Sequence, residues 1–231
     1  MIFVGKEEGN GCETEYFLQS SPCNAQGQRD GMAEQITRED ALTREGYRHA
    51  CHIMLYGDSS AKLFGKIPIK HIVLMQMRFD GLLGFPGGLV NPSEETLEAG
   101  LSRELHEEVG VAVPVGVDNH VSSCLSPSCP RLITHFYIKK MTESELKEME
   151  KAAVATATDH GLEVLGMVRV PLYFLKNGGG LPYFLSHSFI SNSRAQLLSA
   201  LQRCGLLSQG ELEKAVRQAE QMRRTRSGDP H

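Results

Sequence analysis

Four aliphatic residues at regular four-residue intervals predict one amphipathic helix, which constrains the fold of this chain more than any other segment. They are Leu97, Leu101, Leu105 and Val109. A helix of 3.6 residues per turn brings all four to one face, where they form a stripe that must be buried. Asn91, Pro92 and Glu94 are suited to its N-cap, first turn and capping box. Gly110 is suited to its end, so we expect the helix between Asn91 and Gly110.

Three carboxylates lie together on another face of this predicted helix. Glu104, Glu107 and Glu108 stand at positions i, i+3 and i+4, which makes them neighbours on a helix surface. Two carboxylates about 4 Å apart repel by roughly 4 kcal/mol at an effective dielectric constant near 20. Either solvent separates these charges, as on most acidic helix faces, or a cation gathers them. Mg²⁺ and Mn²⁺ prefer carboxylate oxygens and keep coordination positions open for phosphate and water.

A tight apolar turn, Phe85-Pro86-Gly87-Gly88, precedes the helix and can bring bare backbone close to a ligand. Turn and helix together resemble the signature of the Nudix hydrolases, Gly-x5-Glu-x7-Arg-Glu-U-x-Glu-Glu-x-Gly-U, in which U is aliphatic. The matching residues are Glu95, Arg103, Glu104, Leu105, Glu107, Glu108, Gly110 and Val111. Leu89 occupies the position of the first glycine, and Gly88 lies one residue earlier. The loop is therefore one residue longer than the signature.

Other segments resemble the branch of this family that decaps small nucleolar RNA in vertebrates and is also described as an inosine diphosphatase. They are residues 48–52, 74–81, 159–166, 168–173 and 188–190. A sister branch, the syndesmos-like proteins, has lost the acidic residues of the signature and is regarded as non-catalytic. This chain retains them, and the resemblance therefore favours the active branch.

The resemblance implies a metal-dependent hydrolase of diphosphate linkages. The predicted metal ligands are Gly87, Glu104, Glu107 and Glu108, which bind Mg²⁺ or Mn²⁺, with Co²⁺ as a further option. Glu107 is the first choice for the general base, and Glu150 is a weaker alternative. Asp159 and Glu163 are equally consistent with structural roles. Arg103 and Glu95 are interpreted as an ion pair that braces the helix against its loop.

Substrate contacts are also implied by the resemblance, and each has a physical rationale. The predicted substrate-binding residues are His52, Arg78, Phe85 and Gln196. Arg78 can bind phosphate through two hydrogen bonds, Phe85 can contact a flat base, and Gln196 can pair with a purine edge. His52 and Phe85 also suit a core position. Cys124 stands where close relatives have a histidine, for which His120 is a nearby substitute.

The order of predicted elements indicates an α+β fold, the α/β/α sandwich of Nudix proteins with a mixed sheet between helices. Strands are predicted at 47–56, 71–77, 132–138 and 164–171, and helices at 143–155, 193–204 and 211–226. Three segments are expected: a disordered extension over 1–31, a Nudix domain over 32–208, and a basic C-terminal helix or tail over 209–231. No apolar run reaches membrane-spanning length.

The expected reaction is removal of the methylguanosine cap of small nucleolar RNA and of mRNA, together with hydrolysis of inosine di- and triphosphates and their deoxy forms. A net charge of −4 argues against a generally basic nucleic-acid coat, so contact with capped RNA must be local. The alternative is a non-catalytic RNA-binding adaptor of the syndesmos type. The resemblance further implies a homodimer found in the nucleus, with its nucleolus, and in the cytoplasm.

Overall fold

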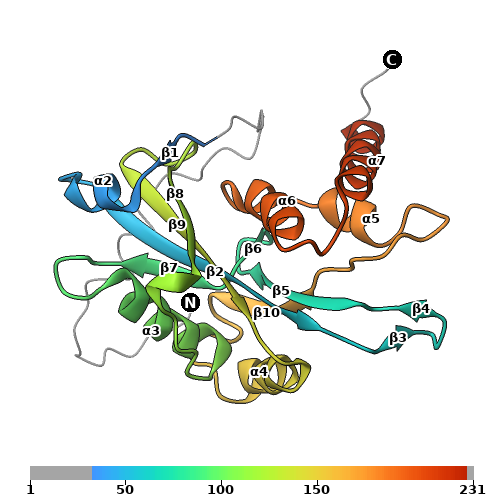
Figure 1. The fold of residues 1–231 in the computed structure, drawn as a ribbon, viewed down its shortest axis with the longest axis horizontal. Helices are drawn as coiled ribbons and strands as arrows, with labels where there is room; N and C mark the ends of the chain where they lie inside the picture. Colours follow the sequence, from blue (N-terminus) through green and yellow to red (C-terminus); the bar gives the residue numbers. More distant parts are fainter. Residues whose placement is uncertain (1–32, 228–231) are drawn as a thin grey trace, which may run out of the picture. The chain divides into compact units, whose positions relative to one another are not determined.

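An eight-stranded mixed sheet forms the centre of the computed structural model, which describes residues 33–227 (Figure 1). Its strands follow the order β1-β8-β9-β2-β5-β10, with β6 paired to β5 and β7 paired to β2. Their bounds are β1 Gln35–Ile36, β2 Arg48–Asp58, β5 His71–Arg78, β6 Leu83–Gly84, β7 Gly87–Val90, β8 His120–Leu125, β9 Leu132–Lys140 and β10 Val164–Arg169. Strands β2 and β9 are parallel, and all other pairs are antiparallel. A separate hairpin consists of β3 (Lys62–Leu63) and β4 (Ile67–Pro68).

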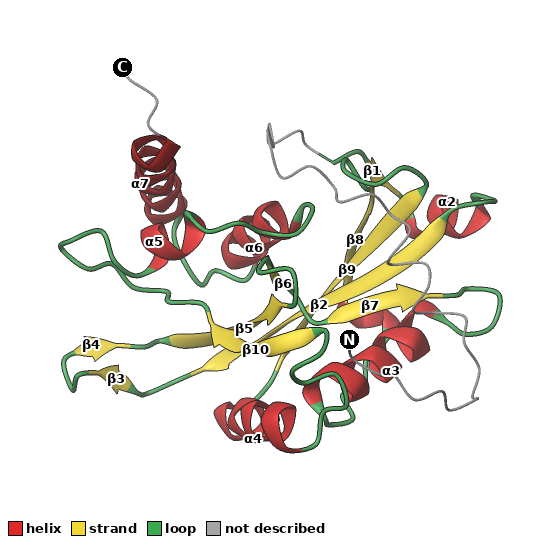
Figure 2. Ribbon diagram, turned by 180° about the vertical axis from the view of Figure 1, so that it is seen from behind, coloured by secondary structure: helices red, strands yellow, loops and turns green. Residues whose placement is uncertain are grey.

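Helices cover both faces of this sheet (Figures 1 and 2). Their bounds are α2 Arg38–Thr43, α3 Leu97–Val109, α4 Glu143–Ala155, α5 Leu181–Leu185, α6 Ser193–Arg203 and α7 Gln209–Ser227, with a short 3-10 helix at Val117–Asn119. Helices α3 and α4 bury apolar residues against one face of the sheet, and α5, α6 and α7 bury theirs against the other. The predicted α+β fold, with a mixed sheet between helices, is confirmed.

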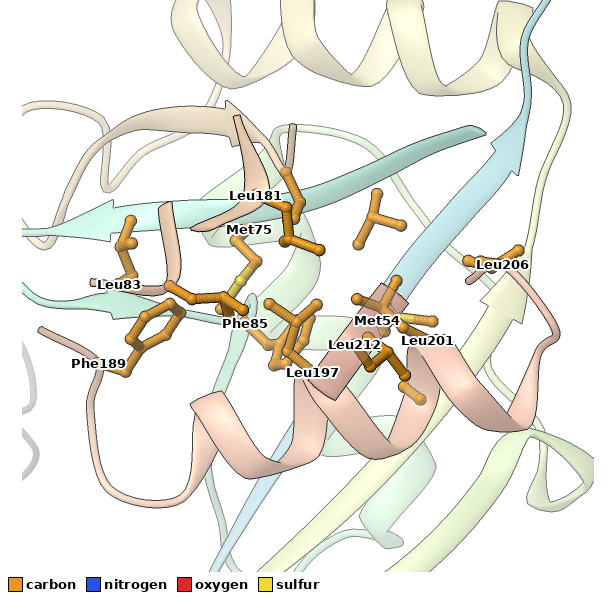
Figure 3. Packing of buried hydrophobic residues seen from close by; sticks show 14 of the residues in the cluster. Met54, Met75, Leu83, Phe85, Leu181, Phe189, Leu197, Leu201, Leu206 and Leu212 are labelled. Atoms are coloured by element: carbon orange, nitrogen blue, oxygen red, sulfur yellow. The ribbon is translucent and has the colours of Figure 1, made fainter. Parts of the chain in front are cut away.

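The long strand β2 connects the two cores because its side chains alternate between the faces. Cys51, Ile53 and Leu55 pack with α3 and α4, whereas Met54 packs with α6 (Figure 3). On the α3 face, the predicted stripe of Leu97 and its three partners is fully buried. This burial fixes the orientation of α3 and therefore the direction in which its glutamates point.

The predicted start of α3 is wrong by one and a half turns. Thr96, not Asn91, is its N-cap, and its hydroxyl accepts a hydrogen bond from the Ala99 amide. Asn91 instead closes a preceding turn, since its carbonyl accepts from the amides of Glu94 and Glu95. The predicted end is correct: Gly110 adopts the left-handed conformation with φ +74°.

The remaining predictions are largely matched within one to three residues. Helix α4 has the predicted bounds, with Thr142 as its N-cap. Helix α7 exists as predicted, but Ala215 and Ala219 pack in the same core as α5 and α6. The predicted extension over 1–31 lies outside the described residues. None of the described helices combines the length and the apolar character needed to cross a bilayer.

Candidate functional site

Glu108, near the end of α3, has a buried carboxylate that is 6% exposed. Its Oε2 accepts a hydrogen bond of 2.6 Å from the Gly87 amide, and its Oε1 accepts one of 2.8 Å from Gln76 Nε2. Burial raises the pKa of Glu108 to about 8, although both hydrogen bonds act in the opposite direction. The negative charges of Glu104 and Asp159 raise it further. A cation beside this carboxylate would relieve the cost of its charge.

The glycine turn packs tightly against the acidic face of α3. Gly87 has φ +123°, and a Cβ there would collide with the Cys51 carbonyl. A Cβ on Gly88 would collide with the carboxylate of Glu104. Gly87 therefore requires glycine, whereas a side chain at position 88 would displace the Glu104 carboxylate. Bare backbone lies directly against the glutamates, as the sequence predicts.

Arg103 holds the loop and two of the acids together. Its Nη2 donates to Glu95 at 3.0 Å and to the Leu89 carbonyl at 3.3 Å. Its Nη1 donates to Glu104 at 2.8 Å and contacts Glu107 at 3.4 Å. The predicted brace between Arg103 and Glu95 is confirmed. The loop departure at Leu89 does not break the brace, because Arg103 binds the backbone there and not a side chain.

A loop from α4 brings further acids to the end of α3. The Glu107 carbonyl accepts hydrogen bonds of 3.3 Å from the Asp159 amide and from Thr158 Oγ1. Burial raises the pKa of Glu163, and the charge of Asp159 raises it further. Asp159 and Glu163 thus belong to the electrostatic surroundings of the predicted site. Glu150, the alternative base, has both oxygens paired with Arg169 at 2.6 Å.

The donor set fits a hard divalent cation by its chemistry. Glu104, Glu107 and Glu108 offer carboxylate oxygens beside the two glycines of the turn, and Glu108 is buried there with no cationic partner among the described side chains. Among residues 33–227, no three His, Cys, Asp or Glu side chains form a ready-made cation cage. Arg103 supplies the positive charge at Glu104 and Glu107 instead.

His52 lies on β2 and Arg78 at the end of β5, close enough for the charge of one to act on the other. Burial lowers the pKa of His52 to about 4, and the Arg78 guanidinium lowers it further. A neutral imidazole can both donate and accept a hydrogen bond. Arg78 pairs with Asp80 at 3.0 Å, and its side chain lies directly over Gly84. These contacts leave the predicted roles of His52 and Arg78 as predictions.

Phe85 and Gln196 lie on the α6 side of the sheet. Phe85 is 2% exposed and packs against Phe136, with 5.0 Å between ring centroids. It lies in the core beside Phe189 and Leu197 (Figure 3), so the ring is not open to a base in this structure. Gln196 is half-buried on α6. Its contact with a purine stays a prediction.

Gln76 is a site residue that the sequence interpretation missed. It is 1% exposed, its Nε2 binds Glu108, and its Oε1 has no hydrogen-bond partner among the described residues. An amide in an otherwise apolar strand was the available signal, since buried polar groups are normally paired.

His120 does not reach the glutamates. Its Nε2 shares a hydrogen bond of 3.0 Å with Ser123 Oγ, which shares one of 2.8 Å with His135. His120 also packs edge-on against Tyr137, whose hydroxyl donates to Glu98 in the first turn of α3. At 1.5 Å per residue, this turn is about 15 Å along the helix from Glu108. The predicted substitution for a histidine ligand is not supported by this position.

Comparison with known proteins gives one family. The family described as "Nudt16-like: U8 snoRNA-decapping enzyme-like" matches residues 49–207 of this chain. The chain is 48% identical over 186 residues to the U8 snoRNA-decapping enzyme of Xenopus laevis, covering 79% of this chain and 87% of that protein. It is 52% identical over 172 residues to the enzyme of that name in Mus musculus, covering 73% and 87%. It is also 44% identical over 185 residues to the Tudor-interacting repair regulator protein of Homo sapiens, covering 79% and 87%.

Proposed function

Because the chain belongs to the U8 snoRNA-decapping enzyme-like family of Nudix hydrolases, we propose that it is a metal-dependent pyrophosphohydrolase that removes the methylguanosine (m7G) cap of RNA. The products are m7GDP and RNA with a 5′-monophosphate. The observation that carries this proposal is the buried carboxylate of Glu108, held at a side-chain-free turn beside Glu104 and Glu107. The buried amide of Gln76 has no other hydrogen-bond partner among the described residues, which supports a site organised around this carboxylate.

Each residue has a defined task in this reaction. Glu104 and Glu108, with the Gly87 carbonyl and Glu107, would hold Mg²⁺ or Mn²⁺, with Co²⁺ as a further option. When bound there, a divalent ion would neutralise the charge of the diphosphate and lower the pKa of a bound water. Glu107, on the exposed side of the cluster, accepts the proton of the attacking water. Glu150 is the less suitable base, because Arg169 occupies both of its oxygens.

Substrate contacts complete the site. Arg78 exchanges Asp80 for a phosphate of the cap bridge, since a guanidinium binds phosphate through two hydrogen bonds. The neutral ring of His52 hydrogen-bonds the bound nucleotide, and Gln196 pairs with the purine edge. Inosine di- and triphosphates carry a related purine, also with an oxygen at C6, and the same kind of phosphate linkage, and are second substrates of this site. Capped RNA, namely small nucleolar RNA and mRNA, is the main partner.

We further propose that the protein is a homodimer of the nucleus, nucleolus and cytoplasm, as the family resemblance implies. Size-exclusion chromatography with light scattering measures the dimer, and imaging of a tagged full-length chain measures the location.

Purified full-length protein, incubated with cap-labelled RNA and separately with inosine diphosphate, tests the activity. We expect m7GDP and inosine monophosphate to be released with Mn²⁺ or Mg²⁺ and not with chelator. Glu107→Gln and Glu108→Gln are expected to abolish release, whereas Glu148→Gln, an exposed carboxylate on α4, is the matched control. Full activity in both site variants refutes the mechanism. Metal-independent RNA binding by the wild type without any release supports the adaptor alternative.

A further inference from the structure

An unused apolar surface lies beside the proposed site. The described residues include eight large hydrophobic side chains that are exposed: Leu42, Phe64, Phe79, Val117, Val154, Leu162, Leu165 and Tyr183. Phe79 (51% exposed), Leu162 (70%) and Leu165 come from two segments that hydrogen-bond to each other, since the Phe79 amide donates to the Glu163 carbonyl at 2.9 Å. Neither hydrophobic core includes them. We call Phe79 and Leu162 the apolar ledge.

The ledge is connected to the acidic face of α3 by a short series of backbone contacts. The Leu162 amide donates to the Asp159 carbonyl at 3.0 Å, and the Asp159 amide donates to the Glu107 carbonyl at 3.3 Å. The other side of the ledge meets Arg78, whose guanidinium carbon lies 5.3 Å from the centre of the Phe79 ring. The ledge therefore lies beside the proposed phosphate contact, Arg78, and its segment is hydrogen-bonded through Asp159 to the backbone at the end of α3.

The Arg78 guanidinium lies over the exposed ring of Phe79, with 5.3 Å between the guanidinium carbon and the ring centre. Its aliphatic stem covers Gly84 on the neighbouring strand β6. A capped RNA has one base on each side of a phosphate bridge. If Arg78 binds that bridge, a base next to the guanidinium lies beside Phe79.

The charges around the ledge select a base over a phosphate. Asp80, Asp159 and Glu163 flank it, and carboxylates repel an RNA backbone. An exposed aromatic ring, in contrast, stacks with any base. A guanidinium packed on one face of the ring leaves the other face for such a stack.

We propose that the apolar ledge is a second base site, which binds the first RNA nucleotide beyond the cleaved linkage. Phe79 stacks on that base, and Leu162 packs against its edge. This inference rests on the proposed function and adds a preference for substrates with a nucleoside on both sides of the phosphates. Substrates with one nucleoside, such as inosine diphosphate, leave the ledge empty.

The test compares KM for a cap dinucleotide (m7GpppG), a capped RNA and inosine diphosphate in the full-length protein. Phe79→Ala is expected to raise the ratio of KM for the cap dinucleotide to KM for inosine diphosphate by about 5- to 150-fold, as for a lost base stack. Phe79→Tyr keeps the ring and should restore the wild-type ratio. Phe64→Ala is the matched control, because Phe64 is 82% exposed in the turn between β3 and β4.

If the KM ratio is unchanged in Phe79→Ala, the proposed second base site is wrong. An equal rise in KM for all three substrates also contradicts it, because Phe79 would then only support Arg78. A wild type that hydrolyses none of them contradicts the proposed function instead. In that case, the second base site is tested separately by measuring the binding of a labelled, methylene-bridged cap dinucleotide by fluorescence anisotropy. Weaker binding by Phe79→Ala than by Phe64→Ala supports it, and equal binding overturns it.

Discussion

The amide of Gly87 donates a hydrogen bond of 2.6 Å to the carboxylate of Glu108. This contact joins the glycine turn to the last turn of α3, across 21 residues of sequence. It also keeps the carboxylate inside the protein, where burial raises its pKa to about 8. Glu108 is therefore a buried acid whose ionised form needs a nearby positive charge.

Glu108→Gln should preserve the fold and abolish turnover. A glutamine oxygen can still accept from the Gly87 amide, whereas a neutral amide is a weak ligand for a hard cation. Because bound metal ions supply several kcal/mol to such reactions, we expect turnover of inosine diphosphate with Mn²⁺ to fall by at least ~100-fold. Melting temperature checks the fold, and Glu148→Gln is the control. Turnover within threefold of wild type would contradict the assignment.

Arg103→Lys should weaken the brace between the loop and α3. The guanidinium contacts Glu95, Glu104 and the Leu89 carbonyl at once, and an ammonium cannot reproduce this fork. Since Arg103 is 36% exposed, we expect a loss of about 1 kcal/mol or less. That corresponds to a melting temperature lower by about 2–4 °C at most, with reduced turnover. Arg217→Lys is the control, since Arg217 makes an exposed pair with Glu213; equal effects of both changes would show that the brace adds nothing.

Tyr137→Phe tests the polar cluster at the start of α3. The fully buried hydroxyl of Tyr137 donates to Glu98 Oε1 at 2.9 Å, and Arg38 binds both oxygens of Glu98. A hydrogen bond to a charged acceptor contributes about 1.5–3 kcal/mol, so the free energy of unfolding in urea should fall by that amount. Tyr183→Phe, at an exposed ring, should change it by less than about 0.5 kcal/mol. Similar values for the two variants would argue against the hydrogen bond.

Acid should destabilise the protein through histidines that are buried or partly buried. Burial lowers the pKa of His135 from 6.5 to about 3, and it also lowers the pKa values of His49 and His120. The unfolded chain therefore binds protons below pH 6.5 that the folded chain does not. Stability is complete above pH 6.5 and falls by up to about 1.4 kcal/mol per pH unit for each such histidine as pH decreases.

A His135→Asn variant separates this effect from general acid unfolding. Urea unfolding between pH 7.5 and 5 should show a shallower decline for the variant than for the wild type. The ring nitrogens of His49 and His135 share a hydrogen bond of 2.9 Å, so the variant is expected to be less stable at every pH. Parallel pH profiles for both proteins would show that His135 does not cause the decline.

Local rules predicted the helices well where one signal dominated. Helix α4 has its predicted bounds because Thr142 and Glu145 form a reciprocal capping box. The predicted start of α3 is too early because Asn91 and Thr96 are both good N-cap residues. The Asn91 carbonyl accepts from the amides of Glu94 and Glu95 and so forms a separate turn before the helix. Strands β6 and β7 are only two and four residues long. Strand β6 folds back on the neighbouring strand β5, whereas β7 pairs with the remote strand β2, a partner that no local pattern contains.

The sequence predicts the charged residues of the site, but not the residues that they contact. The spacing of the glutamates predicted their shared face, and the pairing of Arg103 with Glu95 followed from the signature. The partner of Glu108, Gln76, lies 32 residues away, and only the fold brings it near. The core position of Phe85, in the turn between β6 and β7, likewise depends on Phe136, which lies on the remote strand β9.

Calorimetric titration of Mn²⁺ into the full-length protein, with Glu108→Gln and Glu148→Gln beside it, tests most directly whether the glutamates of α3 gather a metal ion. We predict saturable binding to the wild type and to Glu148→Gln, with an affinity at least ~10-fold lower for Glu108→Gln. No uptake by the wild type, or equal uptake by all three proteins, would contradict the account.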